Sequence, residues 1–442
     1  YGTGIPTIII ILKQKRTNTD ILFVDASKGF VKEGKNNKLR ASDIKRIVDV
    51  VTRREDIDKF SRVVSRDEIR SNDYNLNIPR YVDSSEAAES WDIFSSMFGG
   101  IPNSEVELLN DYWKAFPTLK SSLLEATSSA YCRVTRDDVK KAIKEHDDIK
   151  GFENKFKDAF DGLDDYLHDA LIVQMDNINI SKKEEALAEN TFSRLADIPL
   201  VDKYEAYQLL DDDWANIAID LEIIQTEGFN ATRVVDPNMV IKKKDNKEQE
   251  VQEGWKGRII PFELVQNILL SDETKSIEDK ENRLAEIASE YEEAFDNLSE
   301  EEKELECVNE DSFVFAEVKK ALKNDSVDSE TKEKLKSVIA LNTEEKGLKS
   351  EIKKEKALLE ERTKEIIENL SDEQIVLLLR EKWINPLIES LMQLPERIVS
   401  DLVSKVEALS KKYDSTLAEL ENEIESTERE LSKMIDELEG NE

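Results

Sequence analysis

Residues 70–83 read Arg70-Ser71-Asn72-Asp73-Tyr74-Asn75-Leu76-Asn77-Ile78-Pro79-Arg80-Tyr81-Val82-Asp83. Asparagine and aspartate side chains hydrogen-bond to nearby backbone, so the run after Ser71 predicts turns. The apolar residues from Leu76 to Val82 predict a short extended segment. Pro79 restricts that segment to the edge or end of a strand, because proline has no N–H to donate. The residues alone therefore predict a buried turn followed by an edge strand.

The charge of the chain is uneven. Its 442 residues contain 63 Lys and Arg against 97 Asp and Glu, a formal net charge of −34. This charge argues against unaided nucleic-acid binding by the whole chain. Residues 1–83, however, contain 17 basic and 12 acidic residues. Any phosphate contact is therefore expected in this part. The candidates are Lys13, Lys15, Arg16, Arg53 and Arg54, although solvated surface charges are the simpler interpretation of both clusters.

Two β-branched runs, residues 5–12 and 20–26, predict an antiparallel hairpin. The first run holds four consecutive isoleucines, which is typical of a strand covered on both faces. Nothing else in residues 1–83 supplies that cover. We therefore expect the covering strands upstream, in a longer protein of which this chain is a fragment. A helix with Ser42 as N-cap and an apolar stripe of Ile44, Ile47, Val48 and Val51 should follow, and then a strand at 61–65.

Three strings resemble one family: Ile5 to Lys13, Asp20 to Ser27, and Tyr74 to Asp83. They are similar to the modification (methyltransferase) subunit of type I restriction–modification systems. Residues 91–102 and 158–162 resemble longer members of the same family. The resemblance implies part of an adenine-N6 DNA methyltransferase that uses S-adenosylmethionine. It also implies an assembly in which two modification subunits clamp DNA beside one specificity subunit, together with a restriction subunit.

The motifs for methyl transfer are absent from the sequence. No Asp/Glu-x-Phe-x-Gly-x-Gly string exists for the cofactor, and Tyr1 to Gly4 follows no strand. The strings nearest to an Asn/Asp-Pro-Pro-aromatic loop begin at Asp236 and Asn385, and both lack the second proline and the aromatic residue. In the family these motifs precede the isoleucine run. We therefore expect no catalytic, cofactor-binding or metal-binding residue here, and no activity of the chain alone.

Other features exclude further classes of protein. Cys132 and Cys307 are the only cysteines, and His146 and His168 the only histidines, so neither a disulfide framework nor a zinc site is indicated. No apolar segment approaches 18 residues and no signal peptide is visible, so we expect no membrane contact and a cytoplasmic protein.

From Ser84 the sequence becomes helical. A helix from Glu86 to Phe98 should stop at Gly99-Gly100, and helices at about 136–146, 150–174, 181–196 and 201–226 should follow. A β-hairpin is predicted at 239–252, around Asp245-Asn246. Trp255, between two glycines, could stack on nucleic acid, although an anchor for the hairpin is the simpler interpretation. An apolar helix at 263–270 closes this part.

Residues 271–442 show a coiled-coil-like pattern of apolar residues at steps of three and four. Residues 273–299 and 330–368 carry two such stripes. Ser371 to Gln374 should cap a kinked apolar helix that contains Pro386 and Pro395. One long helix is predicted from Ile398 to Glu439, and its stripe needs a second helix in this chain or in a partner. Its candidate docking residues are Leu402, Leu409, Leu420, Ile424 and Leu431.

The predicted fold is mainly α in three parts. Residues 1–83 form a small β remnant and rim of a Rossmann-like methyltransferase sheet, 84–270 a helical domain with a hairpin, and 271–442 long docking helices. The predicted function is to position the methyltransferase by docking to the specificity subunit, with DNA reached through the assembled complex. The alternative is a freestanding acidic coiled-coil scaffold without a nucleic-acid role. An independent hydrolase or transferase has no supporting motif.

Overall fold

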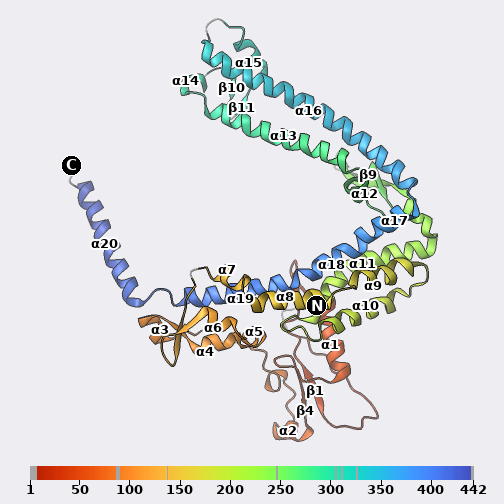
Figure 1. The fold of residues 1–442 in the computed structure, drawn as a ribbon, viewed down its shortest axis with the longest axis vertical. Helices are drawn as coiled ribbons and strands as arrows, with labels where there is room; N and C mark the ends of the chain where they lie inside the picture. Colours follow the sequence, from red (N-terminus) through yellow and green to blue (C-terminus); the bar gives the residue numbers. More distant parts are fainter. Residues whose placement is uncertain are drawn as a thin grey trace. The chain divides into compact units, whose positions relative to one another are not determined.

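The computed structural model describes residues 7–85, 90–136, 138–244, 247–303, 305, 307–309, 312–324 and 327–439. This part of the chain is mainly helical, with five small antiparallel sheets (Figure 1). The predicted fold class is therefore confirmed. The chain divides into two compact units. The domain boundaries predicted after residues 83 and 270 remain predictions. The first unit comprises residues 1–167, 179–218 and 385–442, and the second comprises 168–178 and 219–384.

The N-terminal lobe, residues 7–85 of the first unit, contains two small two-stranded sheets, two helices and a 3-10 turn. Its core contains Phe23, Val64, Ile69, Tyr81 and Val82, with the Phe23 and Tyr81 rings stacked at 4.3 Å. The elements are β1 (Ile21–Val24), β2 (Val31–Glu33), β3 (Asn36–Lys38), α1 (Ala41–Arg53), β4 (Ser61–Val64), α2 (Arg66–Ser71) and η1 (Ile78–Arg80).

The hairpin predicted from residues 5–12 and 20–26 is wrong for the described residues, and Ile5 and Pro6 lie outside them. Strand β1 pairs with β4, with Phe23 opposite Arg62, and residues 7–19 form no strand. Strand β4 is buried at Ser61 and Val64, which lie on opposite faces of the strand, and exposed at Arg62. Ile8 to Leu12 are exposed, because the described residues supply no cover for four consecutive isoleucines.

The Asn-rich stretch forms a turn, but not the buried turn that was predicted, because Tyr74 and Leu76 are exposed, and the predicted edge strand is absent. Asp73 and Tyr74 have φ of 55° and 56°, the left-handed conformation of tight turns. Residues Ile78–Arg80 form a 3-10 turn, and the Tyr81 hydroxyl donates to the Asn75 carbonyl at 2.6 Å. Pro79 fits here because proline is tolerated in the first turn of a helix, where its missing N–H has no helical acceptor.

Helix α1 is present, but its cap and its buried face differ from the prediction. Arg40 is the N-cap, and its backbone N–H donates to the Asp43 carboxylate at 2.9 Å. Ile44 and Val48 are exposed. The buried face carries Ser42 and Asp49, because α11 (Lys203–Glu227) offers polar partners there. The Ser42 N–H donates to Gln208 at 3.0 Å, and the Tyr204 hydroxyl donates to Asp49 at 3.3 Å.

The rest of the first unit is helical around a small three-stranded sheet in the order β5-β7-β6. The predicted stop at Gly99-Gly100 is confirmed, since their φ values are 78° and 93°. The described helix before it begins at Ile93, and residues 86–89 of that prediction lie outside the described part. The elements are α3 (Ile93–Phe98), β5 (Ile101–Pro102), α4 (Asn103–Val106), η2 (Glu107–Leu109), α5 (Asn110–Ala115), α6 (Leu119–Leu123), β6 (Leu124–Ala126), β7 (Tyr131–Val134), α7 (Val139–Lys144), α8 (Asp147–Ala159), α9 (Leu163–Leu167), α10 (Ile180–Leu195), α18 (Asn385–Met392), α19 (Leu394–Lys412) and α20 (Leu417–Glu439).

The single long helix predicted from Ile398 to Glu439 is wrong. Helix α19 ends at Lys412, and α20 begins at Leu417. Tyr413 is buried at the break, against Trp91, with ring centroids 5.8 Å apart. Thr416 then starts a new helix, because the Glu419 N–H donates to its hydroxyl at 3.3 Å and the Thr416 N–H donates to Glu419 at 2.8 Å. The helix is thus interrupted over residues 413–416, where Tyr413 is buried instead of continuing an exposed helix.

The second unit is built on two long antiparallel helices, α13 (Ser271–Asp296) and α16 (Ser329–Glu368), side by side in Figure 1. Arg283 donates to Glu344 at 2.7 Å near the middle, and Lys334 donates to the Asn297 carbonyl at 3.2 Å near one end. The two predicted stripes therefore pair with each other within this chain. The other elements are η3 (His168–Val173), η4 (Met175–Asn177), η5 (Phe229–Arg233), β8 (Val235–Lys244), β9 (Lys247–Gly257), α12 (Phe262–Leu269), α14 (Glu300–Lys303), β10 (Val308–Asn309), β11 (Ser312–Phe313), α15 (Phe315–Ala321), α17 (Asp372–Leu379) and η6 (Arg380–Ile384).

The hairpin predicted at 239–252 is confirmed as β8 and β9, although Asp245-Asn246 lie outside the described residues. Trp255 fixes the hairpin to α16. Its backbone N–H donates to Glu360 at 3.0 Å, and the Lys364 ammonium lies 3.6 Å from its ring centroid. These contacts support the anchor interpretation of Trp255.

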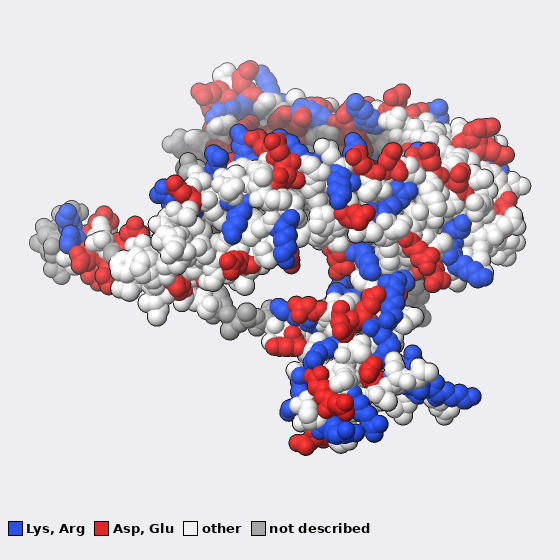
Figure 2. Space-filling view, turned by 60° about the horizontal axis from the view of Figure 1, so that its bottom comes forward, with Lys and Arg blue, Asp and Glu red and all other residues white. Residues whose placement is uncertain are grey.

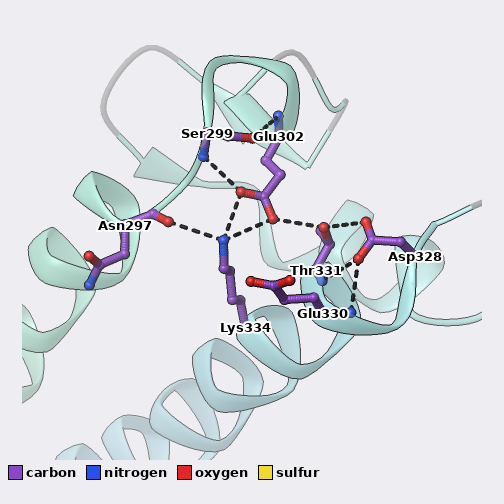
Figure 3. A network of polar contacts seen from close by, with 7 residues as sticks. All are labelled: Asn297, Ser299, Glu302, Asp328, Glu330, Thr331 and Lys334. Carbon is purple, nitrogen blue, oxygen red and sulfur yellow. Dashed lines mark hydrogen bonds and ion pairs between the residues drawn. The ribbon is translucent and has the colours of Figure 1, made fainter.

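A polar network joins α14 to the start of α16 (Figure 3). The Glu302 carboxylate accepts from the Ser299 N–H at 2.7 Å, from Lys334 at 2.9 Å and from the Thr331 hydroxyl at 2.7 Å. Asp328 caps α16, because its side chain accepts from the Thr331 N–H at 2.9 Å. The backbone N–H of Ser299, followed by Lys334, lowers the pKa of Glu302 to about 2.

Glu302 should make the stability of this end of the second unit depend on pH. Because its pKa is lower in the folded state, its contribution is complete above the unfolded value of 4.5 and is lost as the pH falls towards about 2. At about pH 6, Glu302→Gln should lower the free energy of unfolding by roughly 1–2 kcal/mol, with a smaller difference at about pH 3. Hydrogen exchange of residues 297–303 and 329–335 measures this. Glu333→Gln, in an exposed pair with Lys336, is the control, and an equal difference at both pH values would contradict the assignment.

Candidate functional site

The predicted phosphate contacts lie in the N-terminal lobe, where Lys and Arg gather beside scattered carboxylates (the lower part of Figure 2). Arg16 and Arg54, from two separate clusters in the sequence, both donate to the Asp20 carbonyl, Arg54 at 3.3 Å. Within the described part of the chain, Lys13 and Lys15 are exposed and make no ion pair. Arg53 lies 3.7 Å from Glu55. The fold thus brings the two clusters together, and their contact with DNA stays a prediction.

The predicted docking residues fall into two groups. Leu402 is fully buried in α19, which packs on α7 and α8, so it is not available to a partner, and Leu409 is half-buried. Leu420, Ile424 and Leu431 lie in α20 and are 44%, 58% and 57% exposed. All described side chains of α20 from Glu419 to Ile435 are exposed. The candidate docking surface is therefore the α20 stripe, defined by Leu417, Leu420, Ile424, Leu431, Met434 and Ile435.

The sequence did not predict that apolar residues of α3 extend this surface. Phe94, Met97 and Phe98 of α3 are exposed, and α3 packs beside α20. Thr416, at the start of α20, would lie 3.5 Å from a Cβ at Gly99. No local pattern in the sequence predicts that the apolar residues of α3 remain at the surface beside a helix more than 300 residues later.

A second feature, which we name the latch, holds α19 at this point. The Lys412 ammonium lies 3.0 Å from the Glu105 carboxylate and 2.6 Å from the Ser90 carbonyl. The Tyr413 hydroxyl donates to Glu105 at 2.5 Å and accepts from the Asp92 N–H at 3.0 Å. Burial alone would lower the pKa of Lys412, but Glu105 raises it above its ordinary value. The latch therefore fixes the end of α19, and with it the point where α20 begins.

The described residues offer no catalytic constellation for methyl transfer. Asp236 lies in β8 and binds Arg258 at 2.8 Å, and Asn385 begins α18. Tyr1 to Gly4 lie outside the described residues. No group of three or more His, Cys, Asp or Glu side chains in the described part could hold a metal ion. Among the same residues, no helix is long and apolar enough to span a membrane.

S-adenosylmethionine does not fit the lobe's own hollow, which lies beside α1. The sulfonium of the cofactor would meet four cations there, Lys28, Arg40, Arg46 and Lys59. The hollow also lacks a Gly-rich turn after a strand, the feature that holds this cofactor in the family that the sequence resembles.

Comparison with known proteins places the first part of the chain. Residues 1–90 match the model of a family described as N-6 DNA Methylase. The methylase subunit of the type I restriction enzyme MpnII from Mycoplasma pneumoniae is 40% identical over 92 residues, which cover 21% of this chain and 17% of that subunit. The MjaVII methylase subunit from Methanocaldococcus jannaschii is 40% identical over 119 residues, covering 25% of this chain and 21% of the relative. The MjaVIII methylase subunit of the same organism is 34% identical over 131 residues, covering 28% and 22%.

The N-terminal part of the chain is therefore related to the methylase subunits of type I restriction enzymes, and the resemblance is confirmed there. The chain spans about a fifth of the length of these relatives. No solved structure matches the chain.

Proposed function

We propose that the chain is a C-terminal part of a type I DNA adenine-N6 methyltransferase subunit and that it positions the catalytic domain. The observation that carries this proposal is the match of residues 1–90 to the methylase family. In the complete subunit, other residues bind S-adenosylmethionine and the flipped adenine, because those sites require motifs that this sequence lacks. The N-terminal lobe then lies at the edge of the methyltransferase sheet. The exposed Ile8 to Leu12 run supports this placement, since it needs a covering layer.

The partners in this proposal are the specificity and restriction subunits of the same cytoplasmic system, with DNA reached through the assembled complex. The α20 stripe binds the specificity subunit. Its support is the exposure of Leu420, Ile424 and Leu431 along one long helix, which cannot bury its own stripe. The mechanism is positional, because the target sequence is selected by one subunit and the methyl group is transferred by another. A freestanding scaffold, the alternative, leaves the methylase match of residues 1–90 without a role.

Docking through α20 can be tested by co-purification with the specificity subunit. Leu420→Asp, Ile424→Asp and Leu431→Asp together should abolish the complex, because three charges would be buried against an apolar partner face at more than about 2 kcal/mol each. The control places the same residue on other faces of α20: Asn422→Asp, Ser426→Asp and Ser432→Asp. Circular dichroism checks that both variants keep their helix. A complex that survives the apolar substitutions would show that α20 is not the docking element.

A further inference from the structure

A hollow of about 380 Å³ opens in the N-terminal lobe, beside the first turns of α1 and the turn before β4. Lys and Arg outnumber carboxylates in its lining by four to two, whereas the chain as a whole has a net charge of −34. The cations are Lys28, Arg40, Arg46 and Lys59, and the carboxylates are Asp25 and Asp43. A positive hollow in so acidic a chain is typical of a site for an anion.

Both carboxylates are already engaged by the protein. Asp43 accepts from the Arg40 backbone N–H at 2.9 Å and from its Nε at 3.1 Å. Asp25 accepts from the Ser27 N–H at 3.0 Å and from the Ser84 hydroxyl at 2.6 Å. Burial alone would raise the pKa of each group, but these hydrogen bonds hold both values below the ordinary range. Asp43 and Arg40 therefore neutralise each other.

Arg46 and Lys59 have N–H donors without an acceptor among the described residues. The Arg46 guanidinium lies 4.5 Å from the Phe60 ring centroid, and its Nη1 is 3.6 Å from Asp202. Its Nε is buried and has no hydrogen-bond acceptor among the described residues. Lys59 is exposed and makes no ion pair with any described residue. Lys59 also has a φ of 57°, a conformation that asparagine adopts more readily than lysine.

The geometry points to a binding site for a phosphate group in this hollow. A planar guanidinium and an ammonium at one opening can surround the oxygens of a phosphate. Neither lining carboxylate would repel the phosphate with an unpaired charge, because both already accept hydrogen bonds from the protein. Under the proposed function, on which this source of the ligand rests, the phosphate belongs to the DNA backbone. The hollow would then add a phosphate contact to those predicted at Arg16 and Arg54.

The test uses the full chain, a short fluorescent DNA duplex and pyrophosphate at low salt concentration, because the net charge of −34 opposes unaided DNA binding. Lys59→Asn removes the charge at a position where asparagine suits the backbone, so the variant should fold as stably as the wild type. It should lower the slope of log affinity for the duplex against log salt concentration by about 1, and pyrophosphate should compete for the same site. Lys35→Asn is the matched control, because Lys35 is exposed in the same lobe and does not line the hollow.

The outcomes separate the hollow from the proposed function. A salt slope for the duplex lowered by about 1, together with loss of pyrophosphate binding, in Lys59→Asn but not in Lys35→Asn supports both. Loss of pyrophosphate binding alone, measured by calorimetry, supports the phosphate site and assigns it to a free phosphate compound instead of DNA. If the wild type binds neither probe, or if Lys59→Asn and Lys35→Asn bind both probes equally well, the phosphate site is overturned. Docking to the specificity subunit is tested separately through α20, so its success or failure does not depend on this result.

Discussion

Replacing Asp220 by alanine should disrupt much of the packing of the second unit and lower its free energy of unfolding by about 3–5 kcal/mol. The Asp220 side chain is 7% exposed and lies 2.5 Å from the Lys382 ammonium. The same carboxylate oxygen accepts from the indole N–H of Trp383 at 2.8 Å, and Trp383 is 1% exposed. Alanine would leave a largely buried ammonium and a buried N–H without this acceptor, because the Ile259 carbonyl, 2.6 Å from Lys382, carries no charge.

The measurement is hydrogen exchange of residues 219–227 and 372–384, which reports the free energy of opening for this region even if the two units unfold separately. Asp220→Asn keeps a hydrogen-bond acceptor for Trp383 and should cost less. The control is Glu253→Ala, because Glu253 pairs with Lys242 at the surface and should contribute at most about 1 kcal/mol. If the free energy of opening changed by less than about 1 kcal/mol in Asp220→Ala, the Lys382 ammonium would have moved into solvent, where water replaces the lost carboxylate.

The sequence predicted elements well where the signal is local. Ser371 caps α17 as predicted, and Gln374 returns the capping bond at 2.9 Å. The glycines at 99 and 100 end α3, because both adopt a positive φ that other residues rarely adopt. The apolar stripes of α13 and α16 were also predicted, but that these two helices pair with each other was not.

Prediction failed where a distant partner decides. Val50 of α1 is buried and Ile44 is exposed, because the partners of this face, Tyr204 and Gln208, lie more than 150 residues later. An apolar stripe on a short helix indicates that one face packs, but tertiary contacts select the face. For the candidate site, the sequence identified the cations of the lobe and the α20 stripe. It gave no sign that Leu402 is internal or that Lys59 lines a hollow with Arg46.

The latch also joins residues far apart in the sequence, since more than 300 positions separate Glu105 from Lys412 and Tyr413, and breaking it should free α20. Glu105→Ala would leave Lys412 with the uncharged Ser90 carbonyl and remove the acceptor of the Tyr413 hydroxyl. The Lys412 and Glu105 side chains are 15% and 13% exposed, so the loss should cost roughly 2–3 kcal/mol, between the values of exposed and buried pairs. Since Tyr413 fills the break between α19 and α20, its release removes the constraint on where α20 begins.

The expected result is local. In Glu105→Ala, hydrogen exchange of residues 410–420 should become at least about tenfold faster, while that of α13 and α16 stays unchanged, because every latch residue belongs to the first unit. Glu107→Ala is the matched control, since Glu107 is exposed two residues away and makes no ion pair with a described residue. If the α20 stripe docks as proposed, the latch variant should still bind the specificity subunit, but more weakly, because a loosened α20 must be ordered on binding. Unchanged exchange at residues 410–420 would show that the Trp91 and Tyr413 rings hold this end of α19 without Glu105.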